Sequence, residues 1–235
     1  MSATPPGGRG SRPIFDISRP VVGGIPVWPG DTAYRYERTW KIGPGCPVNV
    51  GQVTMSLHTG AHTDAPYHFD DAGADMASVD VAKYVGPCVV ARVAANSSGA
   101  GGGGAGGGQG VRPSDLPPNC ERDLRSAPRL LLRTYAARPS EFDVHMRHLT
   151  PELADWLADR GVVLVGLDTD SMDAFDSKEL PAHRRLAARG VAILEGLDLS
   201  RVESGVYDLV ALPLRLVGAD ASPVRAVLLG KESST

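Results

Sequence analysis

Three of the six histidines in the chain fall within eleven positions, in the segment SLHTGAHTDAPYHF. They are His58, His62 and His68, and Asp64 lies between the second and the third. Neutral imidazoles and a carboxylate are good ligands for zinc or manganese, and the lack of thiolates in the segment favours a catalytic site over a structural one. The segment therefore predicts a metal site that carries out chemistry.

The spacing of His58 and His62 also suits a zinc-binding helix, but Gly60 and Pro66 interrupt such a helix. We therefore expect an extended chain, in which the even-numbered side chains between residues 54 and 68 share one face. The alternative is a set of surface or core histidines with local hydrogen bonds. The density of metal-binding residue types makes that alternative the poorer explanation.

Further ligands must come from the second half of the chain, which offers His183 and Glu195. Glu195 lies in the aliphatic segment VAILEG, where an unpaired carboxylate costs several kcal/mol and a cation removes that cost. The structural alternatives are an exposed or arginine-paired Glu195 and a solvent-facing His183. A carboxylate such as Asp64 can bridge two cations, and paired cations can activate water and polarise a carbonyl together. The sequence does not fix the number of ions.

The composition indicates a globular protein with one domain. Of 235 residues, 42% are hydrophobic and 22% charged, and the net charge of −3 excludes broad attraction to nucleic acid or anionic membranes. Three cysteines without a CxxC pair predict neither a disulfide framework nor a thiolate zinc site. The N-terminus has no apolar stretch typical of a signal peptide, and no apolar run approaches a membrane span. We expect a cytoplasmic protein.

Low-complexity segments bound the predicted domain. Residues 1–12 are rich in Pro, Gly and Arg and predict a disordered tail, and residues 231–235 form a short C-terminal tail. Residues 99–110 contain nine glycines and predict a flexible loop. The domain is expected to span residues 13–230.

Strand patterns outnumber helix patterns along the chain. A helix is predicted over 150–160, where Thr150 can cap the first turn and Gly161 can end the helix, and another over 181–189. Aliphatic and β-branched runs predict strands at 34–41, 48–58, 87–93, 129–135, 162–168, 191–195, 207–214 and 224–229. The expected fold is mixed α/β, with a barrel-like mixed sheet as its core and helices outside.

The histidine segment resembles the metal-dependent cyclase and formamidase family, whose pattern HxGxHxDxPxH is matched by His58, Gly60, His62, Asp64, Pro66 and His68. The likeness extends to VWPGD at 27–31, GLDTDSMD at 166–173, GVAILEG at 190–196 and ALPLRLVGADASPVRAVLL at 211–229. The likeness covers about residues 14 to 230. Within the family, the sequence is similar in particular to the bacterial kynurenine formamidases. The glycine tract and the N-terminal tail look like insertions away from these motifs.

The resemblance implies a homodimeric two-zinc amidohydrolase that cleaves N-formyl-L-kynurenine to kynurenine and formate in tryptophan catabolism. It implies that His58, His62 and Asp64 bind the first ion, and that Asp64, His183 and Glu195 bind the second, with Glu195 also bridging. By the same resemblance, His68 is the catalytic acid and base and Trp28 contacts the substrate. The implied fold, a barrel-like mixed sheet with outer helices, agrees with the strand pattern.

Two other functions remain open at the level of sequence. One is a family hydrolase or cyclase that acts on a different small amide, lactam or lactone, and the other is a metalloprotein that uses its ions only for folding. Trp28 lies in the proline-flanked segment PVWPG, where a buried core tryptophan is the alternative to a substrate contact. Asp168 and Asp170 follow an apolar strand and either support a metal-binding histidine or cap a turn.

Overall fold

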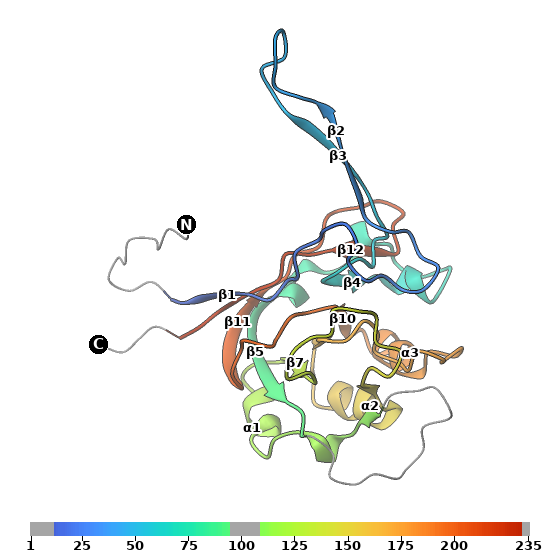
Figure 1. Ribbon diagram of the computed structural model, residues 1–235. Coiled ribbons are helices and arrows are strands. Elements are labelled where there is room, and N and C mark those ends of the chain that lie inside the picture. Colours follow the sequence, from blue (N-terminus) through green and yellow to red (C-terminus); the bar gives the residue numbers. More distant parts are fainter. Residues whose placement is uncertain (1–11, 95–108, 232–235) are drawn as a thin grey trace.

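The computed structural model describes residues 12–94 and 109–231. Its centre is a nine-stranded mixed sheet that curls into a half-barrel, with the strand order β1-β13-β11-β5-β7-β9-β10-β4-β12 (Figure 1). These strands are β1 (Ile14–Asp16), β4 (His62–Asp64), β5 (Val85–Arg92), β7 (Arg129–Arg133), β9 (Leu164–Leu167), β10 (Ala192–Glu195), β11 (Gly205–Val210), β12 (Ala221–Pro223) and β13 (Val227–Leu229). The expected fold class is confirmed.

The middle of the sheet is parallel and its two ends are antiparallel. Strands β5, β7, β9 and β10 run parallel to one another. Parallel neighbours need long crossover connections, and these contain the three helices α1 (Cys120–Leu124), α2 (Pro151–Asp159) and α3 (Pro181–Ala188). The short strands β6 (Gly110–Val111) and β8 (His148–Leu149) pair beside the sheet.

Alternate side chains of the central strands enter two separate hydrophobic cores. On β7, Leu130 and Leu132 pack in the core that contains the buried residues of the helices, whereas Leu131 packs in the other core with residues of β11 and β13. This alternation follows from the two-residue period of a strand. Each face of the sheet is thus packed against a hydrophobic core. This packing includes residues of β10 and so helps to hold the ends of β4 and β10 in place.

The two predicted helices are present within a residue of their expected ends. The Thr150 side chain accepts a hydrogen bond from the Leu153 amide at the start of α2, and Gly161 follows its end with a φ of 73°. The N-cap of α3 is Leu180, whose side chain makes no capping hydrogen bond. The short helix α1 was not expected, because five residues carry too little periodicity to be recognised.

A hairpin of β2 (Arg35–Trp40) and β3 (Val50–Thr54) projects away from the rest of the protein (Figure 1). Every residue of both strands is exposed, and each strand pairs only with the other. The prediction of one continuous strand over 48–58 is therefore wrong: β3 ends at Thr54, and a turn follows before β4. The alternation of apolar residues in this segment marks no buried face.

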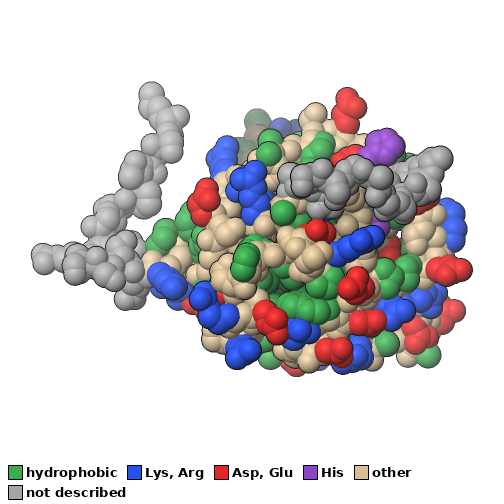
Figure 2. All heavy atoms as spheres, turned by 90° about the horizontal axis from the view of Figure 1, so that it is seen from below, with side chains coloured by type: hydrophobic (Ala, Val, Ile, Leu, Met, Phe, Trp, Pro, Cys, Tyr) green, Lys and Arg blue, Asp and Glu red, His purple; other side chains and the backbone are tan. Residues whose placement is uncertain are grey.

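The predicted tails and glycine-rich loop lie almost entirely outside the described residues. Within residues 12–94 and 109–231, no helix combines the length and the apolar character needed to cross a membrane. On the face of the described residues drawn in Figure 2, basic and acidic side chains are interspersed. This distribution agrees with the small net charge and gives no basic patch on that face.

Candidate metal centre

Strand pairing brings two of the expected ligand segments together. β4 lies between β10 and β12, and its antiparallel register with β10 places Glu195 opposite His62 and Ile193 opposite Asp64. All three residues of β4 are buried. His183 enters from the first turn of α3. The cluster is therefore built on a strand, a strand end and a helix start, elements that hold side chains more firmly than loops do.

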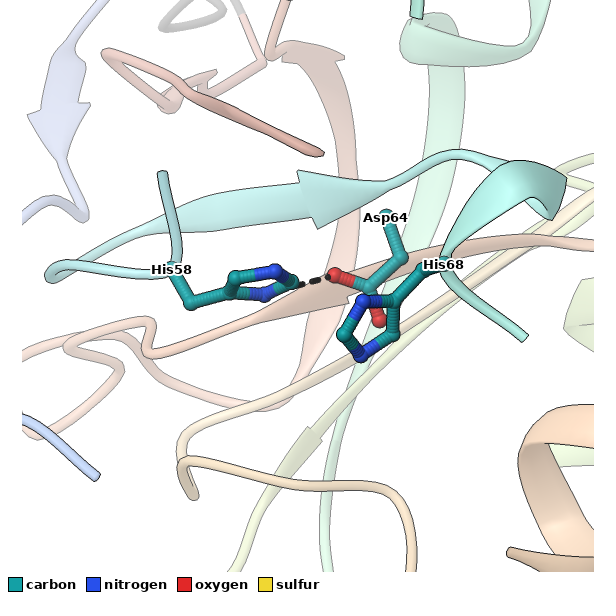
Figure 3. Close-up of side chains that lie close together, drawn as sticks. All are labelled: His58, Asp64 and His68. Carbon is teal, nitrogen blue, oxygen red and sulfur yellow. Dashed lines mark ion pairs between the residues drawn. The ribbon is translucent and has the colours of Figure 1, made fainter. Parts of the chain in front are cut away.

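His58 and His68 reach the cluster from short segments that precede and follow β4 in the chain (Figure 3). His58 lies in the turn before β4, and His68 is the last residue of the short helix η1 (Pro66–His68). The expectation of one extended chain with a common face is wrong here. The histidines converge because turns fold the chain back over β4.

The two oxygens of Asp64 face different histidines. Its Oδ1 lies 3.2 Å from His58 Nδ1 and 3.7 Å from His62 Nε2, whereas Oδ2 lies 3.7 Å from His183 Nε2. Each oxygen thus belongs to a separate group of imidazoles. The family resemblance implies two ligand sets that share Asp64, and the two oxygens are near one histidine group each.

Glu195 spans the same two groups. Its Oε1 lies 3.1 Å from His183 Nε2 and accepts a hydrogen bond of 2.6 Å from the Met172 amide, while Oε2 lies 3.4 Å from His62 Nε2. Burial opposes ionisation of Glu195, but hydrogen bonds and charges from His183 and His62 outweigh it and lower the pKa of this carboxyl. Glu195 is therefore a buried carboxylate whose neighbours are imidazoles.

Each of the three histidines expected to bind metal has a ring nitrogen close to a partner outside the cluster. His62 donates from Nδ1 to the Gly60 carbonyl at 2.9 Å, and His183 donates from Nδ1 to Asp173 at 2.7 Å. His58 Nε2 lies 3.0 Å from Asp220. Such partners fix the ring and its tautomer, so that the remaining nitrogen is directed at the cluster.

The Gly60 carbonyl reaches this position because Gly196 packs against it. A Cβ on Gly196 would lie 2.0 Å from the Gly60 oxygen, and Gly196 has a φ of 70°. Only glycine tolerates both the close approach and the left-handed backbone at no steric cost. Gly60 and Gly196 therefore form one close backbone contact, and this contact positions the carbonyl that His62 binds.

The donor set fits divalent cations. His62 Nε2 and both oxygens of Asp64 are buried and have no hydrogen-bond partner among the described residues. Unpaired buried polar atoms are costly, and cations between them would remove that cost. Burial opposes protonation of His58 and of His183, but the surrounding carboxylates outweigh it and raise their pKa values to about 9 and about 10. The carboxylates thus create a local preference for positive charge.

All members of the cluster except Asp64 line a cavity of about 340 Å³. The cavity is also lined by His68, by Leu180 and by Trp28, whose indole packs against Phe142 and Phe175 with ring centroids 5.3 and 5.1 Å apart. Trp28 is therefore part of an aromatic group at the pocket and not a core tryptophan. The volume is within the range typical of sites for small molecules.

The roles of the acidic residues around the cluster differ from those considered from sequence. Asp168 does not support a metal ligand: it accepts hydrogen bonds from the Thr134 and Tyr135 amides and so caps the end of β7. Asp170 forms an ion pair with Arg138. The outer partners are instead Asp173 and Asp220, which sequence reasoning missed, because no spacing relates them to the histidines that they contact.

Comparison with known proteins identifies the family. A model of the Cyclase family, with the description "Putative cyclase", matches residues 15–174, which is more than half of the chain. The chain belongs to this family. A structure described as a potential metal-dependent hydrolase with cyclase activity is 25% identical, with a TM-score of 0.73, over 94% of this chain and 100% of the other.

Further solved structures share the fold. A predicted metal-dependent hydrolase from Bacillus stearothermophilus is 25% identical, with a TM-score of 0.70, over 94% of this chain and 100% of the other. Isatin hydrolase A from Labrenzia aggregata is 23% identical, with a TM-score of 0.75, over 93% of each chain. The half-barrel is thus a fold that metal-dependent hydrolases use.

Proposed function

We propose that this protein is a metal-dependent amidohydrolase that cleaves N-formyl-L-kynurenine to kynurenine and formate. One observation carries the proposal: three imidazoles and two carboxylates come together, and all of them except Asp64 line a cavity that is also lined by a further imidazole and an exposed tryptophan. The family and its metal-dependent relatives support the hydrolytic part. The sequence resemblance to kynurenine formamidases supports the substrate.

The cation ligands divide into two sets that share Asp64 and Glu195. His58 and His62 would complete one set and His183 the other. Zinc fits these nitrogen and oxygen donors, and manganese is the alternative. When bound, such cations make water more acidic, with a pKa toward ~7, and stabilise the negative charge that develops on a carbonyl oxygen.

His68 has the position of a proton carrier. Its side chain is about one-third exposed, its ring centroid lies 4.3 Å from that of His58, and its Nδ1 lies 3.1 Å from Asp220. Hydrolysis adds a hydroxyl group to the formyl carbon and a proton to the departing arylamine nitrogen. In the proposal, His68 takes the proton from water and delivers it to that nitrogen.

The aromatic group at the pocket provides the surface for the aryl ring of the substrate. Trp28 is 36% exposed and packs against Phe142 and Phe175, which also contact each other. A ring stacked on the indole gains about 1 kcal/mol beyond the area that it buries. In the proposal, Trp28 contributes to substrate binding and not to proton transfer.

The test is formate release from N-formyl-L-kynurenine, compared with formanilide and with a panel of lactams and lactones. We expect N-formyl-L-kynurenine to have the highest kcat/KM. Activity should disappear on chelation and return with zinc, while circular dichroism stays constant. A chain that loses its fold on chelation and hydrolyses nothing would instead be a metalloprotein that uses its ions for stability.

His68→Asn separates proton transfer from metal binding. We expect kcat to fall by about 10²- to 10⁴-fold, because a positioned general acid and base contributes that much, while metal content stays the same. Metal analysis and steady-state kinetics measure the two effects. Undiminished turnover with full metal content would remove His68 from the mechanism.

A second candidate function is the hydrolysis of a cyclic amide. Two isatin hydrolase structures, 23% and 20% identical to this chain, share its fold. Isatin is a fused aromatic lactam, and its ring opening needs the same cation chemistry without an arylamine leaving the site. A kcat/KM for isatin above that for N-formyl-L-kynurenine would favour this candidate.

We further propose that the protein is a homodimer whose subunits meet at the β2–β3 hairpin. The hairpin exposes apolar side chains, and an isolated two-stranded hairpin is only marginally stable in water. Arg35 and Glu37 form no ion pair among the described residues. A two-fold axis brings the same face of both copies together, so that each arginine can meet the glutamate of the other copy. Sedimentation measures the association.

A further inference from the structure

Leu180 has an unusual backbone conformation. Its φ of 48° and ψ of 56° lie in the left-handed region, and it is the one non-glycine residue with a positive φ in the described part of the chain. This region is unfavourable for a residue with a β-carbon. A conformation of this kind persists only where the surroundings hold it, and such residues gather at ligand sites.

Hydrogen bonds on both sides hold Leu180 in place. Its amide donates to Ser177 Oγ at 3.2 Å, and its carbonyl accepts from the Arg184 amide at 3.0 Å as α3 begins. Helix capping does not require the strain, because Asp173 already accepts hydrogen bonds from the amides of Ala182 and His183, each at 3.0 Å. An ordinary N-cap has an extended backbone.

A left-handed turn that served the backbone alone would favour glycine, which adopts this conformation without steric cost. The position instead holds a leucine. Leu180 lines the cavity, together with Trp28 and His183. The strain therefore occurs at a residue with a large side chain that lines the pocket, three residues before a proposed metal ligand.

We infer that Leu180 is a specificity-determining residue, held in a left-handed backbone so that its side chain contacts the aryl ring of the substrate and limits the size of that ring. This inference deepens the proposed function and rests on it for the nature of the substrate. Trp28 supplies an aromatic surface of the pocket, and Leu180 supplies a branched aliphatic one. A single-ring arylamide is accepted, and a fused double ring meets the leucine.

The backbone part of the inference is tested by unfolding. Leu180→Gly and Leu180→Ala both remove the branched end of the side chain, but only glycine, which has no β-carbon, relieves the left-handed strain. We expect the glycine variant to have a Tm about 2–4 °C above that of the alanine variant. Leu214 is 58% exposed, does not line the cavity and has no positive φ. The same pair of changes at Leu214 should give the opposite order, with alanine the more stable.

The specificity part is tested with ring size. We expect Leu180→Ala to raise the ratio of kcat/KM for N-(1-naphthyl)formamide over that for formanilide by about tenfold or more, since a change of a methylene or more in a pocket has effects of that size. Metal content should equal that of the wild type. The ratio for Leu214→Ala should not change.

Binding of 1-naphthylamine and aniline to the metal-loaded protein, measured by calorimetry, separates the two proposals. If no formamide is hydrolysed, the proposed function fails, but Leu180→Ala must still raise the affinity for 1-naphthylamine relative to aniline about tenfold. An unchanged ratio in both kinetics and binding would overturn the specificity role. A glycine variant no more stable than the alanine variant would show that the backbone is not strained.

Discussion

The candidate metal cluster and the β2–β3 hairpin differ in how far the rest of the chain covers them. His62, His183 and Glu195 are each at most 3% exposed; the first and the last lie on strands with a neighbour on both sides, and His183 lies on α3. On the hairpin, Tyr36 and Trp40 are 56% and 59% exposed, and β2 and β3 pair only with each other. The described part of the chain thus buries the cluster, whereas it leaves the hairpin surface exposed, where a second copy would bind in the proposed dimer.

Removal of a shared ligand should have the largest effect. In Glu195→Gln the side chain keeps its shape but loses the charge between His62 and His183. We expect activity to fall by roughly 1,000-fold or more, because in the proposed function bound cations would supply several kcal/mol of transition-state stabilisation. Metal content should fall with it. Elemental analysis and kinetics measure both. Asp198→Asn, a change outside the cluster, is the control and should keep its metal.

Removal of an outer partner should have an intermediate effect. Asp173→Asn weakens the hydrogen bond that orients His183, so we expect metal affinity to fall by about 10- to 100-fold. Asp168→Asn is the matched control, because Asp168 is also buried but caps β7. It should lower the free energy of unfolding while metal affinity stays within about threefold. If both variants bind metal equally well, Asp173 is not an orienting residue.

A change on the hairpin should affect association and spare the cluster. Trp40→Asp places a charge on the exposed apolar surface, and we expect the dimer dissociation constant to rise about tenfold or more, as at interface positions that carry binding energy. Sedimentation at several concentrations measures this change. Metal content should equal that of the wild type. A monomeric wild type, or an unchanged constant, would contradict the dimer proposal.

The smallest effect is expected at the thiols. Cys46 lies between β2 and β3 and is partly exposed, whereas burial raises the pKa of Cys88 to about 12 and that of Cys120 to about 11. A thiol reagent at pH 8 should therefore label Cys46 much faster than the other two, because only the thiolate reacts. Peptide mapping identifies the labelled residue. Cys46→Ser should abolish the fast phase and leave metal content unchanged.

The sequence was sufficient for the parts of the site that depend on residue type. The apolar runs around Leu164 and Ile193 predicted two strands, which the structure pairs with each other. The imidazoles and carboxylates predicted a cation site, and the structure brings these side chains together. The positions of Asp173 and Asp220 were not predictable, because a contact across the fold leaves no local pattern. The prediction that the even-numbered side chains of residues 54–68 share one face was wrong for a related reason. The chain turns within this segment, and these turns, not an extended strand, bring the histidines together.

The hairpin marks the other limit of sequence reasoning. Val53 alternates with polar residues as in a half-buried strand, yet it is 49% exposed. An alternating pattern indicates that one face of a strand is apolar, but it does not indicate whether other residues of the same chain pack against that face. The left-handed backbone of Leu180 was equally invisible, since leucine before proline predicts an extended residue.

The position of β4 between β10 and β12 has a consequence for biosynthesis. The ribosome makes His62 and Asp64 in the first third of the polypeptide, whereas their strand neighbours, which include Glu195 and Pro223, emerge near its end. Such distant pairings form late. The nascent chain therefore has no complete cation site during most of translation, and metallation waits for a nearly finished protein.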